Sequence, residues 1–407
     1  MIRITKGKGK PKNRTFVENN RPIVLAAGGT GGHIVPAMRV ASDLIKTGRK
    51  VVLITDRRFD RYKGLFFKYR FFSSANLRII TIPIRSFNSS PTILTFMLDI
   101  IVSFAKCLLF ILKENPKIFI GFGGYVSVVP LLSALLTFKN IVIHEQNAIF
   151  GKANRIFAKH ASSILFSFPE FSYIPKKQYK EIQNKLIISG LPNFLDEESG
   201  GKSSYKIIHD IGVKEAIVIL ITGGGQGATF FSFNIPPAMI LLAKSHPSIK
   251  FKIFHQVREN EMQVAREMYE SAGITNLIVI MESLFKDVPS LLMIADFAII
   301  RGGASSIVET ANSRVFPIVI PMPNSSGGHQ VKNAKILAKN NAGVMISQNE
   351  YTPEKLALVI NRAISDGLFY FPVINSASEL FKKNSTDVFL NLVLYNDLDF
   401  VYYGGKK

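Results

Sequence analysis

Short apolar runs recur along the chain, each followed by a polar or glycine-rich segment and then by a helix-like apolar period. The runs occupy residues 23–27, 51–55, 117–121 and 141–145 in the first half, and residues 216–222, 251–256, 277–281, 296–300 and 315–320 in the second. Runs of this length that alternate with helical patterns are typical of buried parallel strands in βαβ units. The pattern therefore predicts an α/β protein with two parallel sheets.

The first run leads into residues 28–37, GGTGGHIVPA. Its glycines predict a tight loop that lets the backbone approach a bound group, and Pro36 predicts the opening of a helix whose N-terminus offers N–H donors to an anion. His33 follows the last glycine, and imidazole suits acid–base chemistry near neutral pH. Alone, this stretch fits an anion site and a plain strand-to-helix turn equally well. It is not a dinucleotide fingerprint, because Ile34 stands where the third glycine is needed.

The composition of the chain limits the classes of protein to which it can belong. With 407 residues and 47% hydrophobic content, the chain is long enough for two well-buried domains. The net charge of +21 favours an anionic neighbour, and the lack of a nucleic-acid-binding motif points to an anionic membrane surface and not to nucleic acid. The single cysteine, Cys107, excludes an internal disulfide. Residues 1–21 are basic without an apolar core, which predicts a disordered extension and not a signal peptide.

Two consecutive segments are candidates for contact with that membrane surface. Residues 58–85 interleave basic and aromatic side chains, which fits an interface with anionic lipid and equally a solvated basic face over core aromatics. Residues 92–112 are almost wholly apolar, but Asp99 and Lys106 fall on one narrow polar stripe. Because two charges are costly inside a lone membrane span, we expect an amphipathic helix and peripheral association.

Polar or glycine-rich loops follow several of the predicted strands. Residues 121–127 and 143–147 join residues 28–33 in the first half, and residues 223–228 repeat the glycine-rich junction in the second. Ligands of parallel sheets gather beyond the carboxyl ends of the strands. The three loops of the first half therefore predict one wall of a cleft, and two βα domains with facing loops would enclose it.

A second candidate anion site lies at residues 301–309, RGGASSIVE. The glycines precede a helix that we expect to start near Ala304, and its N-terminus would favour a diphosphate. Glu309, a turn and a half further on, could accept hydrogen bonds from ribose hydroxyls. A capped helix with a surface glutamate is the alternative that these residues leave open.

Taken in order, the motifs resemble the MurG family of peripheral membrane glycosyltransferases. The matching pieces are GGTGGHIVPA (28–37), GFGGYVS (121–127), IHEQN (143–147), GKANR (151–155), GGGQGA (223–228), FHQ (254–256), RGGASSIVETA (301–311) and HQVKNA (329–334). The resemblance implies a GT-B fold, with two Rossmann-like parallel-sheet domains facing across a cleft. It implies transfer of GlcNAc from UDP-GlcNAc to the C4 hydroxyl of the muramyl sugar of lipid I, with inversion, forming lipid II at the cytoplasmic face of the cell membrane.

The resemblance also assigns residues to the two substrates. The N-terminal domain would meet the undecaprenyl-diphosphate-linked acceptor, lipid I, and the C-terminal domain would hold UDP-GlcNAc. Residues 304–309 would contact diphosphate and ribose, Phe285 would lie against uracil, and His329 and Gln330 would read the sugar hydroxyls. The expected substrate-binding residues are Thr30, Gly31, Gly32, Tyr125, Asn147, Gly224, Gly225, Gln226, Phe285, Ala304, Ser305, Ser306, Ile307, Val308, Glu309, His329 and Gln330.

An inverting displacement needs a base for the acceptor hydroxyl and stabilisation of the departing UDP. His33 is the first choice as base and Glu145 the second, although both could instead orient the acceptor. Helix N-termini and glycine N–H groups can stabilise the leaving group, so we expect no metal and no cofactor. The spacing at residues 397–399, Asp-Leu-Asp, lies too near the chain end to be a convincing metal site.

Four positions depart from the family pattern. Gly225 stands where a serine is usual, Phe194 where a linker arginine is expected to meet the nucleotide, Gly328 where a charged residue often precedes the His-Gln pair, and Gly302 where serine is common. Each change could weaken donor binding. A catalytically weak nucleotide-sugar-binding scaffold, or a GT-B transferase with another lipid acceptor, therefore remains as an alternative function.

The expected organisation has four parts. Residues 1–21 form the basic extension, residues 22–187 the acceptor and membrane-associated domain, and residues 188–380 the UDP-GlcNAc-binding domain. Residues 381–407 form a C-terminal tail that could pack back on the N-terminal domain. The linker between the domains is expected within residues 190–205, which are rich in Gly, Ser, Asp and Glu.

Overall fold

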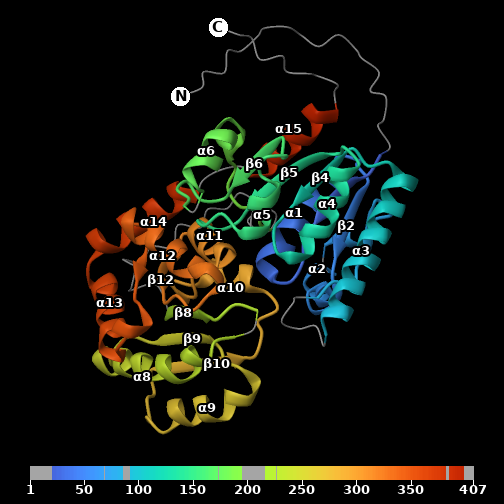
Figure 1. Ribbon diagram of the computed structural model, residues 1–407. Coiled ribbons are helices and arrows are strands. Elements are labelled where there is room, and N and C mark those ends of the chain that lie inside the picture. The colour runs from blue at the N-terminus through green and yellow to red at the C-terminus, as the bar shows by residue number, and fades with distance from the viewer. Residues whose placement is uncertain are drawn as a thin grey trace, which may run out of the picture.

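A computed structural model describes residues 21–67, 69–85, 92–172, 174–194, 216–225, 227–381 and 385–397. Within these residues the chain forms two α/β domains, each built on one parallel sheet (Figure 1). The predicted fold class is confirmed. Most of the expected basic extension, residues 195–205 of the expected linker and the last ten residues lie outside the described part of the chain.

The first domain contains a seven-stranded sheet in the order β3-β2-β1-β4-β5-β6-β7, and every pairing in it is parallel. Its strands are β1 (Ile23–Ala26), β2 (Val51–Thr55), β3 (Leu77–Thr81), β4 (Ile118–Gly121), β5 (Asn140–Glu145), β6 (Ser163–Phe166) and β7 (Leu186–Ile188). The helices with it are α1 (Gly31–Lys46), α2 (Lys63–Phe66), α3 (Ile93–Glu114), α4 (Val128–Leu136), α5 (Lys152–Phe157) and α6 (Lys176–Ile182).

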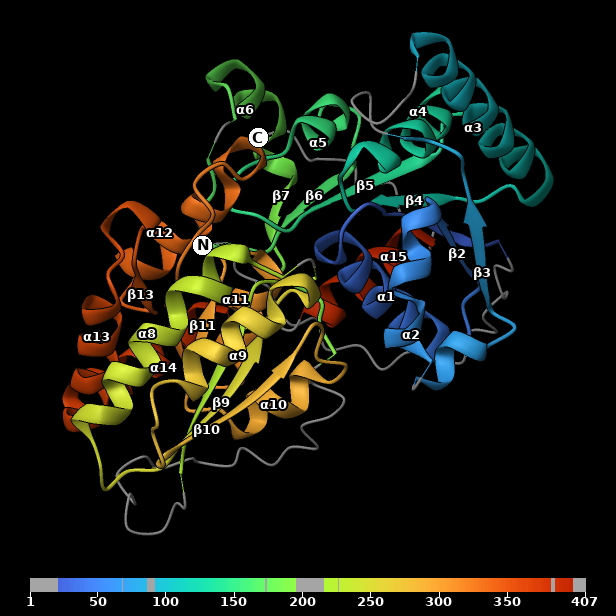
Figure 2. The ribbon, with the colours of Figure 1, turned by 90° about the horizontal axis from the view of Figure 1, so that it is seen from below.

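The second domain contains a six-stranded sheet in the order β10-β9-β8-β11-β12-β13, again parallel throughout. Its strands are β8 (Ile217–Thr222), β9 (Phe251–Gln256), β10 (Leu277–Glu282), β11 (Phe297–Ile300), β12 (Phe316–Val319) and β13 (Val344–Met345). Its helices are α8 (Thr229–Ser245), α9 (Met262–Glu270), α10 (Val288–Ile294), α11 (Ala304–Asn312), α12 (His329–Lys339), α13 (Pro353–Ser365) and α14 (Gly367–Phe381). Figure 2 shows the two sheets side by side with helices on both faces of each.

Alternate side chains of the buried strands supply two apolar layers in each domain. In β1, Ile23 and Leu25 face the core under α1, whereas Val24 faces the core under α3 and α4. Helix α15 (Ser385–Asp397) completes the first of these layers, because Phe389 and Val393 are buried among residues of α1 and β1. The chain therefore returns to the first domain after building the second.

Helix α1 starts earlier than the sequence predicts. Its first residue is Gly31, with Thr30 as N-cap, so Gly31, Gly32 and His33 form its first turn and Pro36 lies inside the helix. The expectation that Pro36 opens the helix is wrong. The first helical hydrogen bonds are donated by His33 N and Ile34 N to the Thr30 carbonyl, so the N–H groups of Gly31 and Gly32 stay available to a ligand.

The aromatic side chains of residues 58–85 belong mainly to the core. Phe59, Phe66 and Phe71 are buried. Phe59 stacks on Phe66, and Phe66 and Phe71 both pack against Phe194, which fills the cluster from the start of the linker. Of the two interpretations that the sequence leaves open, the structure favours core aromatics. Phe194, which replaces the expected linker arginine, lies face to face with Tyr69 at a centroid distance of 4.4 Å.

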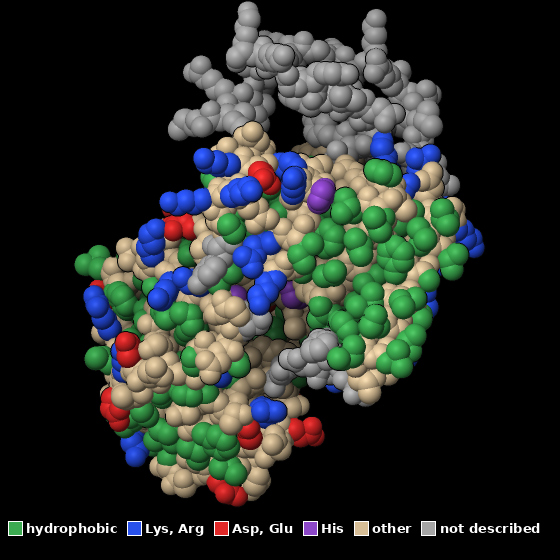
Figure 3. Space-filling view, viewed as in Figure 1, with side chains coloured by type: hydrophobic (Ala, Val, Ile, Leu, Met, Phe, Trp, Pro, Cys, Tyr) green, Lys and Arg blue, Asp and Glu red, His purple; other side chains and the backbone are tan. Residues whose placement is uncertain are grey.

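Helix α3 buries part of its polar stripe against the domain, leaves Lys106 of that stripe exposed, and turns an apolar face outward. Ser103 and Cys107 are buried against the domain, and Asp99 pairs with Arg85 at 2.7 Å. The opposite face exposes a row of large apolar side chains that continues over the end of α4 (Figure 3): Ile93, Leu94, Met97, Leu98, Ile101, Leu109, Leu112, Leu136 and Phe138. By length and composition alone, α3 is long and apolar enough to cross a membrane.

Candidate active site

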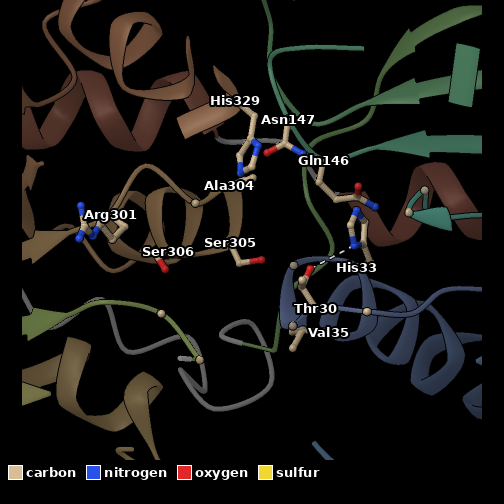
Figure 4. Close-up of a pocket in the computed structure, with 18 of the residues that line it drawn as sticks. Thr30, His33, Val35, Gln146, Asn147, Arg301, Ala304, Ser305, Ser306 and His329 are labelled. Atoms are coloured by element: carbon tan, nitrogen blue, oxygen red, sulfur yellow. Dashed lines mark hydrogen bonds between the residues drawn. The ribbon is translucent and has the colours of Figure 1, made fainter. Parts of the chain in front are cut away.

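A cleft of about 1470 Å³ separates the two domains, at the carboxyl ends of the central strands of both sheets. It is lined by the loops after β1, β2, β4 and β5 from the first domain and by the loops after β8, β9, β10, β11 and β12 from the second. The three loops expected to form one wall do come together here. Figure 4 shows side chains of both domains pointing into the same space.

The first-domain wall centres on the N-terminus of α1. Thr30 has extended backbone and caps the helix without any side-chain hydrogen bond to its amides. Its hydroxyl instead lies 3.1 Å from Nδ1 of His33, so it orients the imidazole (Figure 4). Gly31, Gly32 and Tyr125 line the cleft beside it. The N–H groups of Gly31 and Gly32 thus lie at the cleft wall without a capping side chain.

The imidazole of His33 is held neutral. Burial lowers its pKa to about 4, the positive potentials of His329 and Arg58 act in the same direction, and a hydrogen bond with the Gly28 backbone opposes them. A neutral imidazole can accept a proton, and a pKa this far below neutrality also makes it a weaker base than an ordinary histidine. His33 and His329 approach the cleft from different domains, so the group expected to take the proton faces the group expected to read the donor sugar.

Glu145 forms hydrogen bonds within the loop that follows β5 and with α5. Its carboxylate accepts hydrogen bonds from the amides of Asn147 and Gly151, at 3.1 and 2.9 Å, and from the side chain of Asn154 at 2.8 Å. Burial raises its pKa, and these hydrogen bonds pull it back down. With its oxygens engaged by its own loop, Glu145 is better placed to shape the loop than to accept a substrate proton.

The second-domain wall centres on the N-terminus of α11. Gly303 is the N-cap, and no side chain caps the helix. Ala304, Ser305 and Ser306 line the cleft, and the Ser305 hydroxyl oxygen is buried without a hydrogen-bond partner among the described residues. Because a buried hydroxyl without a partner is costly, Ser305 is a candidate for hydrogen bonding to a ligand in the cleft. The side chains of Ile307 and Val308 point into the core, so these two expected residues could offer only backbone atoms.

Glu309 lies one turn deeper along α11 and lines the same cleft. Burial raises the pKa of its carboxyl group to about 7. Glu309 is half-buried and lines the cleft, so the structure favours a cleft residue over a plain surface glutamate. A carboxyl group with this pKa changes charge near neutral pH, and only its ionised form is a pure acceptor for hydroxyl donors.

A glutamine side chain hydrogen-bonds to the backbone of the glycine loop after β8. Gln256, at the end of β9, accepts a hydrogen bond from Gly223 N at 3.0 Å and donates to Gly224 O at 2.9 Å. Gly224 and Gly225 both line the cleft. The neighbouring expected residue, Gln226, lies outside the described part of the chain.

Tyr62 reaches across the cleft to this loop. A Cβ placed on Gly225 would lie 3.5 Å from the Tyr62 hydroxyl oxygen, and a Cβ on Gly31 would lie 3.2 Å from Cε1 of the same ring. One tyrosine of the first domain thus lies between the two glycine loops. The usual family serine at 225 is absent, and a hydroxyl group from the other domain stands beside that position.

The remaining expected residues differ in how directly they reach the cleft. His329 opens α12 and points into the space beside Ala304 and Asn147 (Figure 4). Gln330 also lines the cleft, but its side-chain oxygen accepts a hydrogen bond from Met322 N at 2.9 Å. Phe285 is 9% exposed and packs edge-on against Phe254, so it presents only an edge to the cleft.

Sequence reasoning missed Arg58, Tyr62 and Asn333 as residues of this site. The first two were assigned to a possible lipid interface, although Arg58 and Tyr62 line the cleft. Asn333 stands in the HQVKNA motif, which was the available signal, and its buried amide joins the two domains. Among the described residues, no three His, Cys, Asp or Glu side chains group closely enough to hold a metal ion.

Two Rossmann-like domains that meet across a cleft at their strand ends define the GT-B class of glycosyltransferases. Solved structures of similar fold include MurG from Acinetobacter baumannii, at a TM-score of 0.69 and 23% identity over 92% of this chain and 99% of that one. Another is a UDP-GlcNAc 2-epimerase from Neisseria meningitidis, at a TM-score of 0.63 and 14% identity over 92% of this chain and 100% of that one.

Sequence comparison identifies the family to which the chain belongs. The N-terminal domain of glycosyltransferase family 28 matches residues 23–166, and the C-terminal domain of that family matches residues 218–388. The chain belongs to glycosyltransferase family 28 and, within it, to the MurG family. It is 30% identical over 373 residues to the UDP-N-acetylglucosamine–N-acetylmuramyl-(pentapeptide) pyrophosphoryl-undecaprenol N-acetylglucosamine transferase of Wolbachia sp. subsp. Drosophila simulans, covering 92% of this chain and 98% of the relative. The transferase of the same name from Rickettsia typhi is 29% identical over 375 residues, covering 85% and 91%.

Proposed function

We propose that the protein transfers GlcNAc from UDP-GlcNAc to the C4 hydroxyl of the muramyl sugar of lipid I, with inversion, and so makes lipid II. One observation carries this proposal most directly. Two helices of different domains, α1 and α11, turn uncapped N-termini toward one cleft. Each N-terminus can bind an anion. A donor and an acceptor that both carry a diphosphate fit such a pair, and the relatives' names specify these two substrates.

The second-domain wall is suited to the donor. The amides at the start of α11 and the Ser305 hydroxyl would bind the diphosphate of UDP-GlcNAc, and Glu309 would accept hydrogen bonds from the ribose. As the bond between the anomeric carbon and the diphosphate oxygen breaks, negative charge grows on the diphosphate. Preorganised N–H donors and a helix dipole stabilise that charge without further rearrangement.

The first-domain wall is suited to the acceptor. The C4 oxygen would attack the anomeric carbon while His33 takes its proton, and UDP would leave from the opposite face of the sugar ring. His33 meets the requirements of a base because it is neutral, oriented by Thr30 and turned into the cleft. Asn147 and His329, which lie close together in Figure 4, would contact the sugar being transferred.

The outward face of α3 is suited to a membrane that carries the acceptor. Lys106 and Lys113 are exposed on the same helix as the apolar row, a combination that favours anionic lipid. We propose peripheral association at the cytoplasmic face, since α3 packs on α4 along its inward side. Extraction of membranes with high salt or alkaline carbonate should release the protein; full retention in the pellet would contradict this.

The decisive experiment incubates the purified protein with labelled UDP-GlcNAc and a lipid I analogue, with and without a chelator. We expect transfer to the lipid I analogue that the chelator does not abolish. Transfer only to a different lipid would favour another acceptor, and binding of UDP-GlcNAc without turnover would favour a scaffold. A Ser305→Ala variant should raise the KM for UDP-GlcNAc, whereas Ser365→Ala, at the far end of α13, serves as the matched control.

A further inference from the structure

The turn that follows β2 places a positively charged side chain in the cleft. Asp56 ends the strand and caps the short 3₁₀ helix η1 (Arg57–Arg61) by accepting a hydrogen bond from Arg58 N at 2.8 Å. Arg57 points to solvent, whereas Arg58 lines the cleft. The segment of residues 58–85, which the sequence analysis considered for lipid contact, therefore places Arg58 in the cleft.

The guanidinium of Arg58 is fixed on two sides. Its Nε donates to the two carboxylate oxygens of Asp56 at 3.2 and 3.0 Å, and Nη2 forms an ion pair with the same carboxylate. The Asp56 side chain is only 4% exposed, so this anchor is rigid. The flat face of the guanidinium lies over the ring of Tyr125, with the central carbon 4.8 Å from the ring centroid. Because these contacts already restrict the Arg58 side chain, it has little conformational entropy left to lose when a ligand binds.

One edge of the guanidinium stays open. Nη1 donates to no acceptor among the described residues, although 35% of the side chain is exposed and can be reached by a ligand. Asp56 occupies the opposite edge. An arginine that is held by a carboxylate on one edge and open on the other has the geometry for two parallel hydrogen bonds to phosphate oxygens.

The guanidinium lies against the glycine turn that precedes α1, with the Asp56-bound Nη2 nearest to Gly29. A Cβ added to Gly29 would lie 2.7 Å from Nη2 and 3.2 Å from Nη1, and Gly29 has φ = +87°. The guanidinium therefore rests directly on the Gly29 backbone, which only a glycine allows. It also stands close enough to His33 to lower the pKa of that imidazole. Arg58 thus contacts the turn and acts electrostatically on the group expected to accept the acceptor proton.

We propose that Arg58 binds a phosphate of the diphosphate that links the acceptor sugar to its lipid, and that Asp56 and Tyr125 hold it in the orientation that this requires. The inference rests on the function proposed above and adds a residue to it. The acceptor is favoured over the donor because Asp56, Gly29, Tyr125 and Arg58 all belong to the first domain. The diphosphate of UDP-GlcNAc is expected at α11, in the second.

Steady-state kinetics with the full-length protein tests this assignment. In Arg58→Gln we expect the KM for the lipid I analogue to rise about tenfold or more, with the KM for UDP-GlcNAc within about twofold of the parent value. Arg58→Lys should recover only part of the affinity, since an ammonium cannot bind Asp56 and a phosphate along two edges. Arg57→Gln removes the same charge one residue away and should change neither constant. Equal increases in both KM values, or no increase for the acceptor, would overturn the assignment.

A binding measurement separates this inference from the proposed function. Farnesyl diphosphate and farnesol share a lipid and differ in the diphosphate, so their affinities can be compared without any transfer reaction. We expect the parent protein to prefer the diphosphate and Arg58→Gln to lose most of that preference. If the parent fails to use lipid I yet shows this Arg58-dependent preference, the reaction is wrong and the anion site stands. If Arg58→Gln keeps the preference, or if Arg58→Gln and Arg58→Lys lose only thermal stability, Arg58 is a structural residue.

Discussion

Asn333 of helix α12 donates a hydrogen bond to Asn147 of the first domain, across 3.1 Å. The same side chain accepts from Ala148 N at 2.8 Å and donates to Gly302 O at 2.9 Å. Asn333 is fully buried, so three hydrogen bonds from one amide tie the acceptor-side loop to the donor-side helix. Asn147 is therefore oriented from both domains, because its Nδ2 also donates to Glu145 Oε1 at 3.3 Å.

Replacing Asn333 by alanine should weaken both the fold and the reaction. The buried Ala148 N–H and Gly302 C=O would lose their partner, at a cost of about 2–4 kcal/mol in unfolding free energy. The freed Asn147 side chain should lower kcat for transfer as well. Urea denaturation and transfer kinetics measure the two effects. The control is Asn340→Ala at the C-cap of the same helix, whose half-buried amide donates to Ile336 O at 2.9 Å and, at the longer distance of 3.5 Å, to Glu170 of the first domain. Equal losses in the two variants would contradict a special role for Asn333.

The activity should persist at mildly acidic pH because His33 is neutral there. With a pKa of about 4, its imidazole remains able to accept a proton down to about pH 5, whereas an ordinary histidine would be half protonated near pH 6.5. We expect kcat/KM at saturating donor to stay flat between pH 8 and 5.5. An acid limb with a midpoint near 6.5 that disappears in His33→Gln would contradict the lowered pKa.

Removing the His33 imidazole should have a much larger effect on turnover than on binding. His33→Ala is expected to lower kcat by about 10²–10⁴-fold, the usual contribution of a positioned base, with little change in the affinity for UDP-GlcNAc. Thr30→Val, which removes the hydroxyl that orients the ring, should produce a smaller loss in the same constant. Near-normal turnover in His33→Ala would remove it as the base.

Donor affinity should rise with pH through neutrality. Burial raises the pKa of Glu309 to about 7, so the carboxyl group is protonated below that pH and ionised above it. If the ionised form accepts the ribose hydroxyls, the KM for UDP-GlcNAc should fall by up to about tenfold between pH 6 and 8. Glu309→Gln should bind the donor more weakly and without this dependence. A parent KM that is flat over this range would contradict the assigned role.

Gly302 should not tolerate a side chain. A Cβ at this position would lie 2.2 Å from the carbonyl oxygen of Gln330, which belongs to the first turn of α12. Gly302→Ala should therefore push α12 away and destabilise the fold by about 1–3 kcal/mol. At Gly303 the nearest atom to an added Cβ is 4.0 Å away, so Gly303→Ala should cost much less. Thermal unfolding of the two variants gives the comparison, and similar losses would contradict it.

The parallel strands could be predicted from sequence wherever both faces are buried. The runs at β1, β2, β8 and β11 are continuous because side chains on both faces pack into cores. Strand β3 is an edge strand with half-exposed positions and Arg78 in its middle, so its apolar signal is broken and it was hidden in the basic and aromatic segment. The start of α1 was misplaced because Pro36 is a stronger helix signal in sequence than two glycines.

The walls of the cleft could be predicted, but the contacts across it could not. Glycine loops and helix starts are local patterns, so residues 28–33 and 301–309 were identified without a structure. The approach of Tyr62 to Gly225, and the bonds of Asn333 to Ala148, join segments more than 150 residues apart. Such contacts depend on how two separately folded domains meet, which a short motif does not encode.

The return of α15 to the first domain means that this domain is not a single contiguous stretch of chain, whereas the second domain is. Phe389 and Val393 fill the layer over α1, and Thr386 donates a hydrogen bond to Asp43 at 2.8 Å. A fragment that ends near residue 194 would leave this layer open to water and expose the apolar side of α1. Anyone who wishes to express the acceptor half by itself should graft residues 385–397 onto it, and any stop codon before α15 should damage the half of the molecule that was synthesised first.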